Sequence, residues 1–232
     1  MSIYAISDLH LAFGTNKPMD IFGYNWENHA EKIKKDWLNK VKEEDLVLLP
    51  GDFSWAMNLE DTYEDFKFLN ELPGKKLLLK GNHDYWWSTI TKLRKYVEVN
   101  DFSTIEFLYN NSFEFENYII CGTRGWMHQE NEENDKILKR ENIRLELSLN
   151  DGIQKFGTDK EIIVCTHYPP FIKKNNGITE AVRIMLKYNV KKCLYGHLHG
   201  VAHADALQGN VLGIDFKLVS CDYTNFSLIR VT

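Results

Sequence analysis

Long apolar segments, basic clusters and paired cysteines are all missing from this chain of 232 residues. No segment approaches the roughly 18 apolar residues that a membrane-spanning helix needs. The N-terminal sequence MSIYAISDLHLAF has no basic region, and Asp8 interrupts its apolar run, so it does not fit a signal peptide. No repeat, low-complexity tract or linker occurs either. We therefore expect a cytoplasmic protein that does not interact with membranes.

The scarcity of positive charge limits the classes of partner. The formal net charge is −5, with 28 basic and 33 acidic residues, and no basic cluster is longer than IKK or VKK. A protein that binds duplex nucleic acid by neutralising phosphates is normally basic, at least in one patch. We therefore expect no duplex partner. Single strands or mononucleotides stay open, because stacking aromatic side chains could hold them.

The four cysteines are spaced too widely for a metal-binding or redox pair. None belongs to a CxxC motif, and each lies in or beside an apolar, strand-like run. Small buried thiols in a reducing compartment explain this distribution. The cysteines are therefore expected to be structural: Cys121, Cys165, Cys193 and Cys221.

The pattern of apolar residues predicts an α/β fold within one domain, residues 1–232. Hydrophobic residues make up 44% of the chain and aromatic residues 13%, enough for a sizeable core. Buried strands are expected over Ile3–Ser7, Leu46–Pro50, Lys76–Lys80, Glu161–Thr166 and Lys192–Gly196. Helices are expected over Glu31–Val41, Glu130–Leu149 and Ile178–Tyr188. A hairpin is expected over Ser112–Cys121, with two or three further strands over Asn210–Val231. Strand–helix alternation combined with hairpins indicates mixed sheets rather than purely parallel ones.

Polar residues follow each of the five predicted strands. In open α/β sheets the ligand crevice lies at the carboxyl ends of the strands, so these side chains are expected to converge. The loops read DLH, GD, GNHD, HYPP and GHLH, and they carry Asp8, His10, Asp52, Asn82, His83, Asp84, His167, His197 and His199.

Seven of these side chains form a donor set for metal ions. Carboxylate, amide and imidazole groups suit manganese, iron, zinc or nickel. One ion needs about four to six ligands, so seven donors suggest two ions, roughly 3.5–4 Å apart. Asp52, alone in its loop, is the natural bridge. His197 and His199 would point to the same side of an extended segment. The set is Asp8, His10, Asp52, Asn82, His167, His197 and His199.

His83 is the odd member of GNHD. If Asn82 binds a metal, its neighbour His83 points elsewhere, toward substrate, where a histidine can donate a proton to a leaving oxygen. Asp84 could orient the His83 ring and hold it protonated. It fits equally well as a cap for the following helix.

The ordered motifs DLH, GD, GNHD, THYPP and GHLH resemble the calcineurin-like metallophosphoesterase superfamily, from Asp8 to His199. Within this superfamily, the chain is similar to uncharacterised bacterial phosphohydrolases of this size. That similarity does not indicate a particular substrate. The resemblance implies a four-layer α/β/β/α sandwich of two mixed sheets flanked by helices, with a dinuclear metal centre between the sheet edges. Manganese is the ion we expect to support activity in vitro.

The resemblance also implies a site assignment. One metal would be held by Asp8, His10, Asp52 and His199. The other would be held by Asp52, Asn82, His167 and His197. His83 would be the general acid, and a metal-bridging hydroxide would attack phosphorus in line. The expected activity is hydrolysis of small-molecule phosphate esters.

One departure bears on the substrate. The members of the superfamily that resemble protein phosphatases follow GD with a loop that carries a phosphate-binding arginine, whereas this chain reads GDFSWAM. We therefore expect the substrates to be phosphodiesters or small organic phosphates rather than phosphoproteins. Arg124 could contact phosphate instead, together with Asn82, or it could brace its loop. A catalytically silent binding scaffold and a single-strand nuclease are the alternative functions, although silent scaffolds tend to lose ligands and none is missing here.

Aromatic residues and further histidines surround the metal loops. The aromatic residues could form a rim that stacks on an organic group, or they could pack the loops against the core. Of the histidines, His29 is expected at the surface, His128 is a candidate second substrate contact, and His203 is expected behind the ligands or at the surface. The aromatic set is Trp55, Tyr85, Trp86, Trp87, Trp126 and Tyr168.

Overall fold

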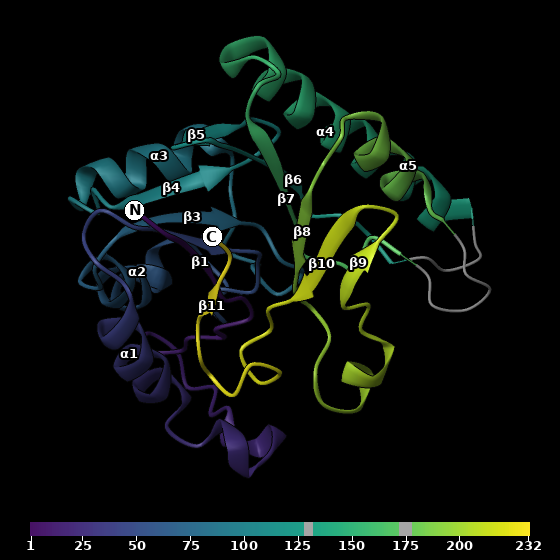
Figure 1. Cartoon of the computed structure of the whole chain (residues 1–232). Coiled ribbons are helices and arrows are strands. Elements are labelled where there is room, and N and C mark those ends of the chain that lie inside the picture. The colour runs from purple at the N-terminus through teal and green to yellow at the C-terminus, as the bar shows by residue number, and fades with distance from the viewer. Residues whose placement is uncertain (128–131, 172–177) are drawn as a thin grey trace.

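The chain folds into two β-sheets that are packed face to face and flanked by helices, as seen in a computed structural model that describes residues 1–127, 132–171 and 178–232 (Figure 1). One sheet has five strands in the order β11-β1-β2-β3-β4, and the other has six in the order β5-β6-β7-β8-β10-β9. In the first sheet β1 to β4 are parallel and β11 is antiparallel to β1. In the second, β6, β7, β8 and β10 are parallel, and β5 and β9 are antiparallel edge strands.

The strands are short, and most follow the apolar runs. The first sheet contains β1 (Ile3–Ala5), β2 (Leu46–Leu49), β3 (Lys75–Leu79), β4 (Ile105–Leu108) and β11 (Ile229–Arg230). The second sheet contains β5 (Phe113–Phe115), β6 (Tyr118–Thr123), β7 (Glu161–Thr166), β8 (Lys192–Tyr195), β9 (Gly209–Val211) and β10 (Ile214–Leu218).

The helices cover the outer faces of both sheets (Figure 1). Over the five-stranded sheet lie α1 (His29–Lys40), α2 (Tyr63–Asn70) and α3 (Ile90–Val99), and over the six-stranded sheet lie α4 (Glu132–Phe156) and α5 (Glu180–Lys187). Short 3-10 segments are η1 (Asp20–Phe22), η2 (Tyr24–Trp26), η3 (Glu60–Thr62) and η5 (Gly200–Asp205). Thr89 and Thr179 start α3 and α5, because each side-chain oxygen accepts a hydrogen bond from the amide three residues later.

Alternation along the strands produces the layers. Leu46 and Leu48 of β2 face the second sheet, whereas Val47 and Leu49 face the helices of their own sheet. In β7, Ile163 belongs to the same inter-sheet layer. Because side chains alternate between the two faces of a strand, fully buried strands read as continuous apolar runs. The predicted four-layer α/β/β/α sandwich with two mixed sheets is confirmed.

Several predicted details are confirmed and two are wrong. β7 has its predicted bounds, the hairpin forms as β5 and β6, and the C-terminal segment supplies three strands. All four cysteines are buried and free. However, α3, the helix that follows Asp84, begins only at Ile90, too far along the chain for Asp84 to cap it, and α4 continues to Phe156 rather than ending at Leu149. Among the described residues, no helix combines the length and the apolar character of a membrane-spanning segment.

Candidate metal centre

The parallel strands of both sheets end at the same edge of the molecule, where the loops after them meet. The two sheets are joined there by a parallel bridge between Ser7 and Ser220, which extends β1 and β10. The loops after β1, β2 and β3 come from the first sheet, and the loops after β7 and β8 come from the second. Their polar side chains lie close together, as expected for strand ends in α/β sheets.

Asp8 lies at the middle of the first group of donors. Its Oδ1 is 3.2 Å from Nε2 of His199, and both of its carboxylate oxygens accept a hydrogen bond, 3.1 Å long, from the backbone amide of His197. The ligand atoms of Asp8, His10 and His199 lie within 4.8 Å of one another, a group that could hold a metal ion.

Asp52 connects this group to a second one. Its Oδ2 is 3.8 Å from Nε2 of His10 and 3.5 Å from Nε2 of His167. Asp8, Asp52 and His167 form another group that could hold a metal ion, and all three are buried. Asp52 therefore lies between the His10 side and the His167 side of the site.

Asn82 completes the second side. Its Oδ1 is 2.6 Å from Nε2 of His167 and 2.8 Å from Nδ1 of His197. His167 Nδ1 lies 3.0 Å from the Pro50 carbonyl, which can only accept, so that nitrogen carries the proton. Burial lowers the pKa of His167 to about 3, so its ring is neutral at pH 7. With the carboxamide oriented as in the structure, the lone pair of Nε2 faces the oxygen of Asn82.

Two facing lone pairs repel each other unless both atoms bind the same cation, which would lie to one side of the line that joins them. The same crowding affects the carboxylates, because burial and the charges of Asp84 and Asp8 raise the pKa of Asp52. Burial also tends to raise the pKa of Asp8, but the charge and hydrogen bond of His199, together with the neighbouring His167 and His10, outweigh it and hold that pKa well below its usual range. The donor atoms therefore fit a site for cations, since bound cations would relieve both the repulsion of lone pairs and that of carboxylates.

The backbone of the site is strained. Four of the seven candidate ligands have a positive φ: 59° at Asp8, 46° at His10, 54° at Asp52 and 73° at His197. Residues other than glycine rarely adopt this backbone conformation, and when they do it is often at a functional site. His197 is therefore not in an extended segment, and the same-side expectation for His197 and His199 is wrong: His197 faces Asn82 whereas His199 faces Asp8.

Glycines let the loops approach one another. At Gly81, a Cβ atom would collide with the carboxylate of Asp52. At Gly51, where φ is +95°, it would lie 2.6 Å from Nδ1 of His167. The glycines of GD and GNHD thus provide the space in which the donors meet.

Asp222 is a site residue that the sequence analysis missed. Its Oδ1 accepts a hydrogen bond from Nδ1 of His199 at 2.8 Å, and its Oδ2 is 3.2 Å from Nε2 of His203. A carboxylate behind a histidine ligand fixes the orientation of the ring. Asp222 follows β10, so the strand-end rule that found the other loops could have found it. His203 lies behind the candidate ligands, which is one of the two positions expected for it.

Asp84 makes different contacts from those expected. Its carboxylate accepts hydrogen bonds from four backbone amides and from Nε1 of Trp86, and no described contact joins it to the His83 ring. Nor does it cap α3, which begins after Thr89. Asp84 instead ties the GD loop to the GNHD loop. The amide donors are those of Asp52, Phe53, Ser54 and Gly81.

His83 lies beside the donor groups. Its backbone amide donates to Oδ1 of Asp52 at 2.8 Å. Its ring lies 4.5 Å from the Trp55 ring and 5.7 Å from the His10 ring, between centroids. Its Nδ1 has no hydrogen-bond partner within the described part of the chain. The ring therefore faces the site without belonging to either donor group.

Arg124 supports the site through its backbone. Its carbonyl accepts hydrogen bonds of 3.0 Å from the amides of His167 and Tyr168, and its guanidinium lies 4.6 Å from the centre of the Trp126 ring. Any residue at this position could make these backbone hydrogen bonds, so both interpretations of the arginine side chain, phosphate contact and loop brace, stay predictions. The side chain also lines a cavity.

Most of the aromatic cluster packs the loops. Trp86, Trp87 and Tyr168 are buried, whereas Trp55 is half-buried and stacks on His10, with 4.7 Å between ring centroids. Tyr85 is 54% exposed and is available at the rim.

Two further histidines were considered in the sequence, His29 and His128. His29, expected at the surface, is half-buried, with Nε2 3.1 Å from the carbonyl of Leu9. His128 lies outside the described residues.

Structural comparison places the chain near three solved structures over nearly its whole length. A protein of unknown function, AQ665 from Aquifex aeolicus, is 20% identical, with a TM-score of 0.51 and coverage of 99% of this chain and 95% of that one. The phosphopantetheinyl hydrolase PptH from Mycobacterium tuberculosis is 12% identical, with a TM-score of 0.59 and the same coverage. TT1561 of Thermus thermophilus is 15% identical, with a TM-score of 0.56 and coverage of 98% and 96%. At these identities the likeness concerns the fold.

Sequence comparison identifies the family. No curated protein is similar enough to match the chain. The family model described as calcineurin-like phosphoesterase, however, matches residues 1–201, which include all seven candidate ligands and His83. With the shared fold and the two groups of donors, this match means that the chain belongs to the calcineurin-like phosphoesterases.

Proposed function

We propose that the chain is a dinuclear metal-dependent hydrolase of phosphoric esters. The observation that carries the proposal is the meeting of His167 Nε2 with Asn82 Oδ1 at 2.6 Å, because both atoms present lone pairs and a cation would satisfy them. Asp8 and Asp52 bring two negative charges into the same buried space. Membership of the phosphoesterase family supports the reaction class.

The donor groups divide into two sets. Asp8, His10, Asp52 and His199 would hold one ion. Asp52, Asn82, His167 and His197 would hold the other, with Asp52 shared. Manganese, iron, zinc and nickel all suit these donors, and manganese is the ion to test first. When bound, such ions polarise the phosphoryl group and supply a nucleophilic oxygen at neutral pH.

His83 is proposed as the general acid. Its ring lies beside both donor groups, and its buried Nδ1 lacks a hydrogen-bond partner among the described residues, a partner that the leaving oxygen of a bound ester would supply. Asp84 is a positioning residue, because its hydrogen bonds hold the loops that carry Asp52 and His83. Arg124 and Asn82 remain the candidate contacts for the phosphate group.

Phosphodiesters and small organic phosphates are the proposed substrates. The loop after Asp52 carries Trp55, stacked on His10, where an arginine would favour a phosphate dianion. Duplex nucleic acid is not among the proposed substrates, because the chain is acidic overall. A silent scaffold would differ from the proposal in lacking turnover, with or without bound metal, and a single-strand nuclease would differ in salt-dependent cleavage of oligonucleotides.

The test compares two nitrophenyl esters. Metal-free protein is reloaded with Mn²⁺, and hydrolysis of bis-p-nitrophenyl phosphate and p-nitrophenyl phosphate is measured. Turnover of either ester establishes the hydrolase, and the faster one identifies the ester class. Two ions bound per chain with no turnover would favour the scaffold, and monoester hydrolysis hundreds of times faster would contradict the diester preference.

A variant of His83 tests its role. His83→Asn keeps a polar side chain but cannot transfer a proton, and it should lower kcat by about 100-fold or more for an ester with a poor leaving group, such as a phenyl ester. The loss should be smaller for the p-nitrophenyl ester, whose leaving group needs less help. An equal loss for both esters, with metal content unchanged, would show that His83 does not act as the acid.

A further inference from the structure

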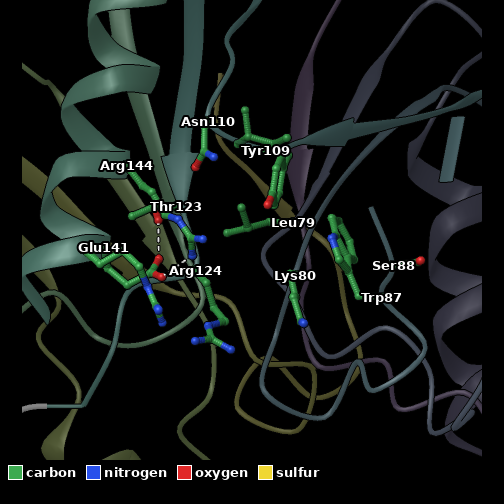
Figure 2. A pocket seen from close by; sticks show the side chains of 12 residues that line it. Leu79, Lys80, Trp87, Ser88, Tyr109, Asn110, Thr123, Arg124, Glu141 and Arg144 are labelled. Carbon is green, nitrogen blue, oxygen red and sulfur yellow. Dashed lines mark hydrogen bonds and ion pairs between the residues drawn. The ribbon is translucent and has the colours of Figure 1, made fainter. Parts of the chain in front are cut away.

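A cavity of about 290 Å³ lies beside the candidate metal centre (Figure 2). It is bounded by the ends of β3, β4 and β6 and by α4. In Figure 2, Arg124, Glu141 and Arg144 line one side, and Lys80 and Trp87 line the other. The four basic side chains in its wall are Lys80, Arg124, Arg140 and Arg144.

The positive charge in this wall is not balanced. Among the described residues that line the cavity, Glu141 is the one acidic residue, and its carboxylate is already occupied. Oε1 accepts from Nη1 of Arg144 at 2.6 Å, and Oε2 accepts from Oγ1 of Thr123 at 2.6 Å. Four cations and one anion leave a net local charge of +3 in a chain whose overall charge is −5.

The remaining three cations differ from Arg144 in their surroundings. Across the described ranges, no ion pair links Lys80, Arg124 or Arg140 to a carboxylate. Nε of Arg124 is buried and lacks a hydrogen-bond partner within the same part of the chain. Like charges gathered without counter-charges raise the energy of the folded protein, and a bound anion would lower it.

Residues that line the cavity are directly connected to the loops of the candidate metal centre. Lys80 is two residues before Asn82, so their Cα atoms lie within about 8 Å of each other. The carbonyl of Arg124 accepts the hydrogen bond from the backbone amide of His167. Trp87 lies four residues after His83 in the loop between β3 and α3. One bound molecule could therefore contact both the metal-centre loops and this cavity.

We propose that the cavity binds a second anionic group of the substrate, a phosphate or a carboxylate several bonds away from the ester that is hydrolysed. This inference rests on the proposed function and narrows its substrate class to organic phosphates with two anionic ends. Arginine side chains can grip such groups with two parallel hydrogen bonds, and lysine adds a point charge. Trp87 and Tyr109 offer ring surface to the segment that joins the two anionic ends.

Phosphonates test the cavity without requiring turnover. Mn²⁺-loaded full-length protein is titrated calorimetrically with alkanes of increasing length that carry a phosphonate at one end or at both ends. At the best length, the bisphosphonate should bind about tenfold more tightly than the monophosphonate. An arm with ω-carboxyalkyl phosphonates identifies the preferred second group, since the better of the two acids should give the larger ratio.

Variants locate the effect. Arg140 is exposed on α4, so Arg140→Met should fold normally and reduce the affinity ratio toward one, as should Lys80→Met. Lys139→Met is the matched control, because it removes one positive charge from the neighbouring position on α4 outside the cavity lining. The control should keep the wild-type ratio.

The outcomes separate the cavity from the hydrolase. A wild-type ratio near one, or a ratio that Arg140→Met and Lys80→Met leave unchanged, overturns the cavity proposal. Hydrolysis of bis-p-nitrophenyl phosphate by the same preparations tests the proposed function. A tenfold ratio without turnover supports the anion site and contradicts the hydrolase, whereas turnover with a ratio near one does the reverse.

Discussion

The two sheets contribute different chemistry to the candidate metal centre. The loops of the first sheet supply the oxygen donors, Asp8, Asp52 and Asn82, with a single histidine, His10. The loops of the second sheet supply only imidazoles, and their positions are His167, His197 and His199. Neither sheet holds a full set for an ion, so the site exists only when the apolar layer between the sheets is formed.

The difference extends to burial and support. Three of the four donors from the first sheet are buried and Asn82 is half-buried, whereas His167 is the one buried donor of the second sheet. His197 and His199 are half-buried, and His199 forms a hydrogen bond to Asp222 that fixes its orientation. Negative charge held in the interior is costly unless it is neutralised. The first sheet therefore brings negative charge that cations would neutralise, and the second brings imidazoles, which would bind those cations in their neutral form.

The largest expected effect comes from removing charge at the shared position. Asp52→Asn should lower kcat/KM by about 1,000-fold or more, since an ion at this site is worth several kcal/mol. The metal-free variant should also melt higher than metal-free wild type at pH 7. Burial and neighbouring carboxylates raise the pKa of Asp52, and a raised carboxyl pKa means that stability is lost as pH rises through it.

Both halves of that prediction are measurable. Metal-stripped proteins are compared by thermal melting, and reloaded proteins by hydrolysis of bis-p-nitrophenyl phosphate. A variant that loses activity and also melts lower without metal would show that Asp52 stabilises the fold rather than the ions.

Lys76 gives the next largest effect, and it concerns stability alone. Lys76 in β3 is almost fully buried, and burial lowers its pKa from 10.5 to about 8. As the pH falls from 10.5 to about 8, Lys76 becomes protonated in the unfolded chain but stays largely neutral in the folded chain. The free energy of unfolding should therefore decrease by about 3 kcal/mol over this pH range. Lys76→Met should remove that dependence, as measured by urea unfolding at several pH values.

Lys192→Met in β8 is the matched control from the other sheet. Lys192 is partly exposed and forms an ion pair with Glu161. The control should keep the wild-type dependence of stability on pH. Equal behaviour of the two variants would contradict the asymmetry in buried charge between the sheets.

The smallest effect should come from the support of the second sheet. Asp222→Asn keeps an acceptor for Nδ1 of His199 but removes the charge, and it should weaken metal binding by about 10- to 100-fold. Equilibrium titration of the metal-free protein with Mn²⁺ measures it. An unchanged affinity would mean that the backbone alone positions His199.

The layered fold could be predicted from the sequence because its strands are buried on both faces. Such strands read as continuous apolar runs, and the five runs singled out became strands with bounds shifted by at most two residues at either end. Short elements without such runs escaped notice: β4, of four residues, and α2, which is rich in charge at its start.

The end of α4 shows why local sequence can mislead. Asn150, Asp151 and Gly152 have the composition of a turn, yet the helix continues to Phe156. A Cβ atom on Gly152 would lie 2.7 Å from the side chain of Ile119 in β6, so the glycine marks close packing of helix on sheet. Long-range contact decided the conformation there.

The convergence of the candidate ligands could be predicted from the sequence, but their geometry could not. The strand-end rule brought the candidate ligands together, and the structure places them in contacting groups. It could not give the positive φ angles that aim Asp8, His10, Asp52 and His197, nor the hydrogen bonds that draw Asp84 to the backbone. Those depend on how loops from both sheets pack against one another.

The most direct test is the electron paramagnetic resonance spectrum of the Mn²⁺-loaded protein, recorded together with its metal content. We expect two Mn²⁺ ions per chain and the spectrum of an exchange-coupled pair, because Asp52 would be shared between the two sets of ligands. Asp52→Asn should convert it to the signal of isolated ions or abolish binding. A wild-type protein that binds one uncoupled ion, or none, would contradict the dinuclear centre.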